Sequence, residues 1–273
     1  MSLEKEPSTR LEEVAQNQKK CFESGRAEKL RKGDSEFFTL SEIDYGFGKR
    51  RVFIKKEQED YELLQGARGG SVPLDGSPHT DLIEAAREQE LGIDERDTVR
   101  TNELDYISEQ LGIPIGKSGV FSELGFRVPK LLKFYKDRGM KVSGYDVLEI
   151  NILSATELGY DVQRYDFNDC SDQLEISDSD LVVSYHMLEH LSDPLKAVKK
   201  IYSSMKPGAY FHVEVPIEPG IPNIRYGHMF PFEKADLGRM LDMSGFILLT
   251  ASNNTHGGGQ YIERYFAQKP DVK

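Results

Sequence analysis

The residues best suited to chemistry stand in the string YHMLEH at residues 185–190, with a further histidine, His228, later in the chain. Histidine changes its protonation state near neutral pH, so it suits a general base that takes a proton from an acceptor group. Glu189 and His190 lie within one helical turn of His186, where a Glu–His pair also fits a purely structural role. We therefore take His186, His190 and His228 as candidate catalytic residues.

The same string also reads His-x-x-Glu-His, which matches the inverted zinc-protease pattern. A protease of that kind needs one helix to carry both histidines, and such a helix would have to run through Asp193-Pro194. No further ligand motif follows downstream. A metallohydrolase is therefore a remote alternative, and a divalent metal at this string is possible but not expected.

The elements around the string indicate a strand–helix–strand unit. Residues 181–183 are apolar and β-branched, which is typical of a strand buried on both faces. Asp193 and Pro194 predict a helix start, and apolar residues recur at helical spacing over 195–205. Residues 206–208 end the helix, and 209–215 alternate as a strand. The string then lies at the carboxyl edge of a parallel sheet, where open α/β folds bind ligands.

Acidic residues also mark the ends of earlier predicted strands. Glu123 and Gly125 close a strand that begins at residue 119, and Asp146 closes the next one, about twenty residues after the turn. A carboxylate in that place can accept hydrogen bonds from both hydroxyls of a ribose. Asp166 follows a third strand, and three carboxylates around one pocket favour a cationic ligand.

These patterns resemble the class I S-adenosylmethionine-dependent methyltransferases, and in particular the small-molecule O-methyltransferase branch that includes the ubiquinone-biosynthesis enzymes. The resemblance is carried by SYHMLEHLSDP, by KPG at 206–208, by the strand ending in Pro216 and by GHMFPF at 227–232, within residues 116–273. It implies a Rossmann-like, mostly parallel seven-stranded sheet with an antiparallel last strand, and S-adenosylmethionine as the cofactor. The cofactor-binding residues that it implies are Glu123, Gly125, Arg127, Asp146, Val147, Asp166, Phe167 and Ser184.

The turn after the first strand of this sheet departs from the family pattern. Arg127 and Pro129 stand where the family has its second and third glycines. Pro129 suits the start of a helix at 130–135, and Arg127 could pair with the carboxylate of the cofactor. A methyltransferase-like pseudoenzyme, or a binding protein that has lost its cofactor, is the alternative.

Composition limits the remaining choices. The chain has 273 residues, a net charge of −11 and two cysteines, Cys21 and Cys170. The acidic balance argues against a nucleic-acid partner, and no apolar stretch is long enough to span a membrane. We expect a cytoplasmic protein with reduced thiols.

Residues 1–115 read as an accessory α+β region, and residues 116–273 as the methyltransferase domain. The first region should contain a helix or arm within 4–34, a β-hairpin formed by 37–40 and 51–54, a Gly/Pro-rich loop at 69–78, and helices near 81–91 and 102–111. The predicted function is S-adenosylmethionine-dependent methyl transfer to the hydroxyl of a small-molecule acceptor. A homodimer is left open.

Overall fold

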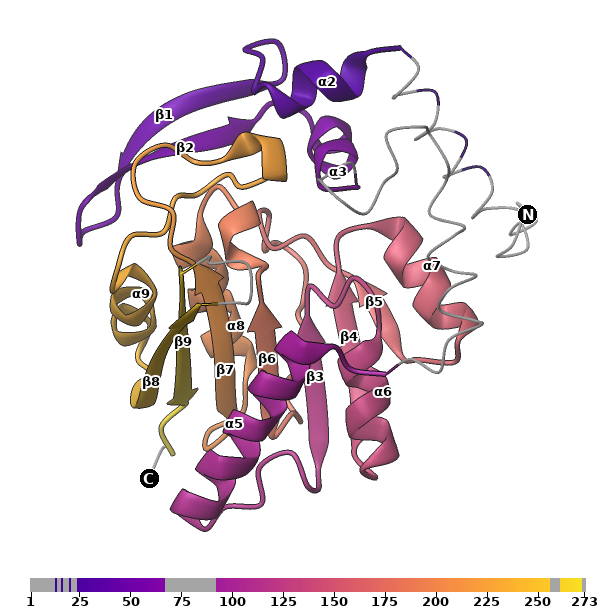
Figure 1. Ribbon diagram of the computed structural model, residues 1–273, viewed down its shortest axis with the longest axis vertical. Helices are drawn as coiled ribbons and strands as arrows, with labels where there is room; N and C mark the ends of the chain where they lie inside the picture. Colours follow the sequence, from indigo (N-terminus) through magenta and orange to yellow (C-terminus); the bar gives the residue numbers. More distant parts are fainter. Residues whose placement is uncertain are drawn as a thin grey trace.

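The computed structural model describes residues 24–66, 92–255 and 261–271, together with Glu13, Gln16 and Lys20. A seven-stranded sheet forms its centre, with helices on both faces (Figure 1). The predicted loop at 69–78 and helix at 81–91 lie outside the described residues, as does most of the arm before residue 24.

The sheet has the strand order β5-β4-β3-β6-β7-β9-β8. Its strands are β3 (Val120–Leu124), β4 (Lys141–Asp146), β5 (Val162–Arg164), β6 (Leu181–Tyr185), β7 (Tyr210–Pro216), β8 (Ile247–Thr255) and β9 (Tyr261–Gln268). Strands β3 to β7 run parallel, and β9 is antiparallel to both β7 and β8. The predicted α/β fold, with a mostly parallel sheet and an antiparallel last strand, is confirmed.

Strand β6 illustrates how the two faces are covered. Leu181 and Val183 belong to a core formed with α5 (Glu95–Leu111) and α6 (Lys130–Asp137). Val182, pointing the opposite way, belongs to a core formed with α8 (Pro194–Ser204) and α9 (Asp236–Ser244). The strand is apolar throughout because both of its faces are buried. Helix α7 (Glu149–Glu157) lies between β4 and β5 in the chain.

Capping residues set the helix starts. The Asp193 carboxylate accepts the Lys196 N–H at 3.0 Å, and Pro194 is the first residue of α8, as predicted. Helix α5 begins at Glu95, earlier than the predicted 102–111, because Asp94 accepts the Asp97 N–H at 3.0 Å. This helix packs against the sheet although it precedes residue 115, so the division of the chain at that point stays a prediction.

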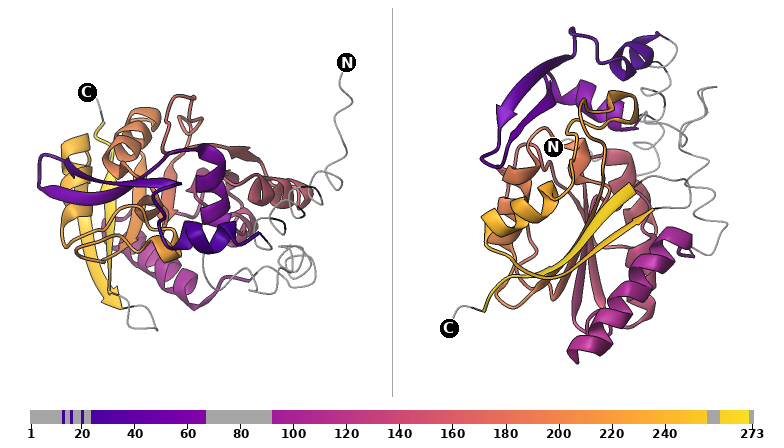
Figure 2. Two further views of the ribbon diagram at one scale, coloured as in Figure 1. Left: turned by 90° about the horizontal axis from the view of Figure 1, so that it is seen from above. Right: turned by 60° about the vertical axis from the view of Figure 1, so that its left-hand side comes forward.

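The N-terminal elements form a cap over the carboxyl ends of the parallel strands (Figures 1 and 2). The cap, residues 26–66, consists of α2 (Arg26–Arg31), β1 (Phe38–Asp44), β2 (Lys49–Lys55) and α3 (Gln58–Gly66). Strands β1 and β2 pair as the predicted hairpin. The Arg50 guanidinium donates to both carboxylate oxygens of buried Asp236, and the Phe53 N–H donates to the Met229 carbonyl at 2.9 Å. The cap is thus fixed to the loops that follow β7.

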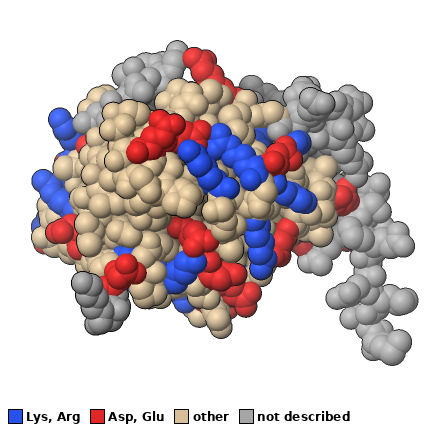
Figure 3. All heavy atoms as spheres, turned by 90° about the horizontal axis from the view of Figure 1, so that it is seen from below, with Lys and Arg blue, Asp and Glu red and all other residues tan. Residues whose placement is uncertain are grey.

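The surface shows no segregation of charge on the face drawn in Figure 3, where basic and acidic side chains are interspersed. Among the described residues, no helix combines the length and apolar character that crossing a membrane requires.

Candidate active site

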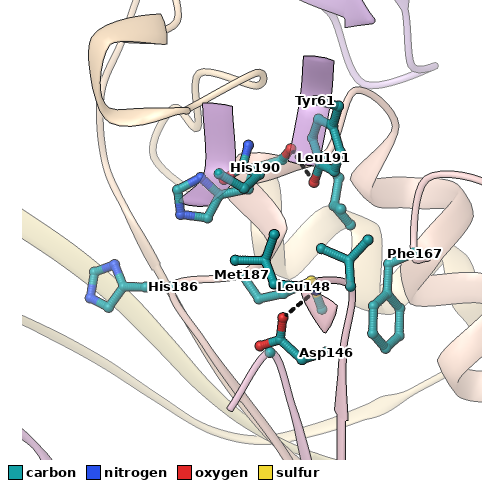
Figure 4. Close-up of a pocket in the computed structure, with 11 residues that line it drawn as sticks. Tyr61, Asp146, Leu148, Phe167, His186, Met187, His190 and Leu191 are labelled. Carbon is teal, nitrogen blue, oxygen red and sulfur yellow. Dashed lines mark hydrogen bonds between the residues drawn. The ribbon is translucent and has the colours of Figure 1, made fainter. Parts of the chain in front are cut away.

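A pocket opens where the parallel strands end beneath the cap. Six of the predicted site residues line it: Gly125, Asp146, Val147, Phe167, His186 and His190. The lining also contains Tyr61, Gln65, Leu148, Met187 and Leu191, which the sequence did not single out (Figure 4). The other predicted residues, Glu123, Arg127, Asp166, Ser184 and His228, lie outside this lining.

The turn after β3 is held by the Asp146 carboxylate. One oxygen accepts the Arg127 N–H at 3.0 Å, and the other accepts the Leu148 N–H at 2.9 Å. Gly125 has φ +76°, and a Cβ atom there would lie 2.7 Å from Cγ of Met187, so only glycine fits. Arg127 has φ +50°, the left-handed conformation that glycine adopts most easily. The altered turn therefore keeps its shape through backbone contacts with Asp146.

Asp166 faces the cap. Its carboxylate accepts a hydrogen bond from the Lys55 ammonium at 3.0 Å and another from the Asn168 N–H at 2.8 Å. Lys55 also stands 5.0 Å from the ring centroid of Tyr61, which lines the pocket. The cofactor-binding role of Asp166 stays a prediction, and Lys55 would be a neighbour of the bound cofactor there.

Glu123 and Ser184 lie in the strands beneath the pocket. Among the described residues, Oε2 of Glu123 and Oγ of Ser184 are buried polar atoms with no hydrogen-bond partner. Burial raises the pKa of Glu123 well above its usual value, and the nearby Asp97 carboxylate adds to this. An unpaired buried carboxyl group of this kind is suited to a cationic or hydrogen-donating ligand.

His186 is held between two carboxylates. Its Nδ1 lies 3.1 Å from Glu189 Oε1, and its Nε2 lies 3.0 Å from Glu214 Oε1. Burial lowers the pKa of His186, but the hydrogen bonds to Glu189 and Glu214 outweigh it, so the net shift is upward. Glu214 in turn accepts hydrogen bonds from Arg100 of α5 and Arg264 of β9. A histidine kept protonated in this way is a poor proton acceptor, although its catalytic role stays a prediction.

His190 and His228 lie together on the far side of Glu189. The His190 Nδ1 lies 2.9 Å from the Gly227 carbonyl, which can only accept, so this nitrogen carries the proton. The His228 Nδ1 lies 2.5 Å from the Glu218 carboxylate. The two rings meet edge to face, with centroids 4.9 Å apart. Because each Nδ1 is occupied by a hydrogen-bond acceptor, Nε2 is the nitrogen that offers a lone pair.

The comparisons with known proteins agree with this geometry. Residues 116–251 match a family model described as a methyltransferase domain. These residues form a methyltransferase domain of the class I S-adenosylmethionine-dependent superfamily. A search of functionally curated proteins finds no match.

Solved structures share the methyltransferase fold at low sequence identity. The [4+2]-cyclase SpnF is 14% identical, with a TM-score of 0.54, over 71% of this chain and 94% of its own. A Haemonchus contortus phosphoethanolamine N-methyltransferase 2, in complex with S-adenosyl-L-methionine, is 15% identical, with a TM-score of 0.50, over 62% of this chain and 53% of its own. A methyltransferase solved with the Haloferax volcanii Trm112 activator is 13% identical, with a TM-score of 0.50, over 65% of this chain and 94% of its own. These likenesses establish the fold alone.

The residues present fit the cofactor that this superfamily uses. Gly125 and Val147 belong to the pocket lining. The Asp146 carboxylate also lies there, with the apolar side chains of Leu148 and Phe167 near it (Figure 4). The unpartnered Glu123 Oε2 lies at the buried end of the same turn.

The lining residues that sequence analysis missed come from two sources. Tyr61 and Gln65 belong to α3, whose sequence, QEDYELLQG, carries no motif, so only the docking of the cap brings them to the pocket. Tyr61 donates through its hydroxyl to the His190 carbonyl at 3.1 Å, and Gln65 donates through Nε2 to the Gly227 carbonyl at 3.0 Å. Met187 and Leu191 lie within the segment SYHMLEHLSDP, but apolar residues in that segment did not indicate a binding role.

Proposed function

We propose that this protein transfers a methyl group from S-adenosylmethionine to a hydroxyl group of a small molecule. One observation carries the proposal: a single pocket is lined by Gly125 and Asp146 and also by His186 and His190. Four of the predicted cofactor residues and two of the predicted catalytic residues thus line one continuous space, as a transfer reaction requires.

At the cofactor end, Asp146 would bind the ribose. Each of its carboxylate oxygens accepts one backbone N–H, and a carboxylate oxygen can accept more than one hydrogen bond, as the hydroxyls of a ribose require. Val147, Leu148 and Phe167 would pack against the adenine. When bound, S-adenosylmethionine supplies a methyl group on a positively charged sulfur. The Asp146 carboxylate would favour that charge.

At the acceptor end, the Nε2 lone pair of His190 would receive the proton of the acceptor hydroxyl. The His228 ring, which lies outside the lining, packs edge to face against His190 and supports it. Gln65 adds a hydrogen-bond acceptor, because its Nε2 is committed to Gly227 and its buried Oε1 has no partner among the described residues. Glu189 Oε2 is likewise buried and unpartnered there. Acceptor-only groups around a small pocket select a ligand that donates hydrogen bonds, as a hydroxyl does.

A cofactor-binding protein without methyl transfer is the second candidate. Arg127 occupies a glycine position of the turn, and SpnF, a neighbour in fold, is described as a [4+2]-cyclase. A fold therefore does not fix the reaction. The metallohydrolase alternative has less support, because residues 188–190 form a single 3₁₀ turn and α8 starts only at Pro194.

Calorimetric titration with S-adenosylhomocysteine tests whether the protein binds the proposed cofactor. We expect a dissociation constant in the micromolar range, about −8 kcal/mol. The same titration with adenosine alone, which lacks the methionine part, should give weaker binding if the turn after β3 contacts that part. No heat of binding at millimolar S-adenosylhomocysteine would overturn the proposal.

A further inference from the structure

Helix α3 of the cap is tied to His190 by two hydrogen bonds. The Tyr61 hydroxyl donates to the backbone carbonyl of His190 at 3.1 Å (Figure 4). One helical turn further along the same face, the Gln65 side chain donates through Nε2 to the Gly227 carbonyl at 3.0 Å. The His190 Nδ1 lies 2.9 Å from that same carbonyl.

We propose that Gln65 is a positioning residue, which acts through the Gly227 carbonyl to fix the tautomer of His190. The role of His190 as the base rests on the proposed function, whereas the coupling of the cap to its ring does not. Docking of the cap and preparation of the base are then one event, so the acceptor end of the pocket is complete only while α3 is in place.

The Gly227 carbonyl receives two donors, one from the cap and one from the YHMLEH string. A carbonyl oxygen has two lone pairs and can accept from both at once. Because a carbonyl cannot donate, the His190 Nδ1 bears the proton, and Nε2 is the acceptor nitrogen of the ring. The tautomer that can take a proton from a hydroxyl therefore depends on the direction of this one carbonyl.

The backbone at Gly227 does not fix that direction by itself. Its φ is +76°, and glycine can rotate through this region at little cost. A Cβ atom there would lie 3.0 Å from Gln65 Oε1 and 3.2 Å from Nε2, so glycine also lets the amide reach the carbonyl. The N–H of the same peptide, from His228, donates to the Asn223 carbonyl at the longer distance of 3.2 Å. The Gln65 contact thus helps to hold the carbonyl oxygen toward His190.

The loop that carries Gly227 and helix α3 also share a hydrophobic core. Tyr61 and Leu64 of α3 pack in one cluster with Ile224 and Met229, which flank Gly227 in the chain. The Gln65 side chain beside this cluster is only 4% exposed, so water competes little for its hydrogen bond. A displacement of α3 would therefore disturb the loop and the carbonyl together.

Nitrogen-15 spectra of the full-length chain test the proposal. The histidines are labelled, and the His190 ring signals are identified by their loss in His190→Gln. Long-range proton–nitrogen correlations at about pH 8.5, where an ordinary imidazole is neutral, distinguish the two tautomers. We expect the wild type to carry the proton on Nδ1. Gln65→Met, which keeps the size of the side chain and removes its donor, should shift the tautomer ratio toward Nε2–H by about fivefold, the effect of one neutral hydrogen bond.

Gln58→Met is the matched control, because it makes the same change on the same helix, where the amide donates to Glu62. It should leave the His190 signals unchanged. A purely structural role of Gln65 would lower the stability of Gln65→Met without moving the tautomer ratio, and an unchanged ratio in the folded variant overturns the proposal.

A measurement on the wild type keeps the test decisive if Gln65→Met does not fold. Two donors that meet at one carbonyl bring the Gln65 amide protons near the His190 Nδ1 proton, so a nuclear Overhauser effect should connect them. Its absence, or an Nε2–H tautomer in the wild type, also overturns the proposal. S-adenosylhomocysteine is titrated into the same wild-type sample. A failure to bind it would count against the proposed function alone, so the two results are separate.

Discussion

The two ends of the pocket are built in different ways. At the cofactor end, Asp146 is the last residue of β4 and Gly125 directly follows the neighbouring parallel strand β3. The contacts that shape the turn are backbone amides donating to one carboxylate. At the acceptor end, the position of Glu189 depends on a chain of buried ions from α5, β6, β7 and β9. A local pattern specifies the first end, whereas the second depends on the whole sheet. Substitutions at the cofactor end should therefore mainly weaken ligand binding, whereas substitutions in the buried ion network should mainly lower the free energy of unfolding.

Glu214→Ala is expected to have the largest effect, because it leaves Arg100, Arg264 and His186 without their shared buried carboxylate. We expect the free energy of unfolding to fall by about 3–5 kcal/mol in urea titrations. Glu42→Ala, which removes an exposed pair with Lys49, should cost less than about 1 kcal/mol. Equal losses in the two variants would contradict the dependence of the acceptor end on the buried network.

Asp146→Ala should affect ligand binding more than stability. Loss of the hydrogen bonds to the ribose should weaken S-adenosylhomocysteine binding by roughly ten- to a hundredfold, or about 1.4–2.7 kcal/mol. Calorimetry measures this change, with Asp105→Ala, from an exposed pair with Arg138, as the control. An unchanged dissociation constant would remove Asp146 from the cofactor site.

Four of the eight predicted cofactor residues line the pocket, because their sequence signals are local, and their binding role stays a prediction. Gly125 and Asp146 end strands that hydrophobic patterning already locates, and both lie in the pocket. The acceptor end was predicted only in part: His190 and His228 were named, but Glu218, Gln65 and the Glu214 network were not. Their positions depend on strand order and on the docking of the cap, and neither leaves a periodic pattern in the chain.

Arg127→Gly is expected to stabilise the fold by about 0.5–1 kcal/mol. The substitution removes the backbone strain of a non-glycine residue held in the left-handed conformation at φ +50°. The greater conformational freedom of glycine in the unfolded chain offsets part of the gain. Arg127→Ala keeps the Cβ atom and should give no gain. We also expect weaker S-adenosylhomocysteine binding if the guanidinium pairs with the ligand carboxylate. Tighter binding by Arg127→Gly would mean that the arginine obstructs the pocket.

The pH dependence of stability should report on His186 and is the smallest expected effect. Because the folded-state pKa of His186 is raised above its unfolded value of about 6.5, its contribution is fully present below that pH. The contribution is lost as the pH rises through the folded pKa. Unfolding free energies of the wild type and His186→Gln should therefore converge toward alkaline pH. A difference that grows with pH would contradict the charged state of His186.

Methyl transfer itself is the most direct test of the account. The full-length protein is incubated with methyl-labelled S-adenosylmethionine, together with a panel of small hydroxyl compounds and their amine and methyl-ether analogues. The account predicts label in products from hydroxyl compounds, with S-adenosylhomocysteine released in equal amount and no product from the ethers. Cofactor binding without transfer to any hydroxyl compound, or transfer confined to the amines, would contradict it.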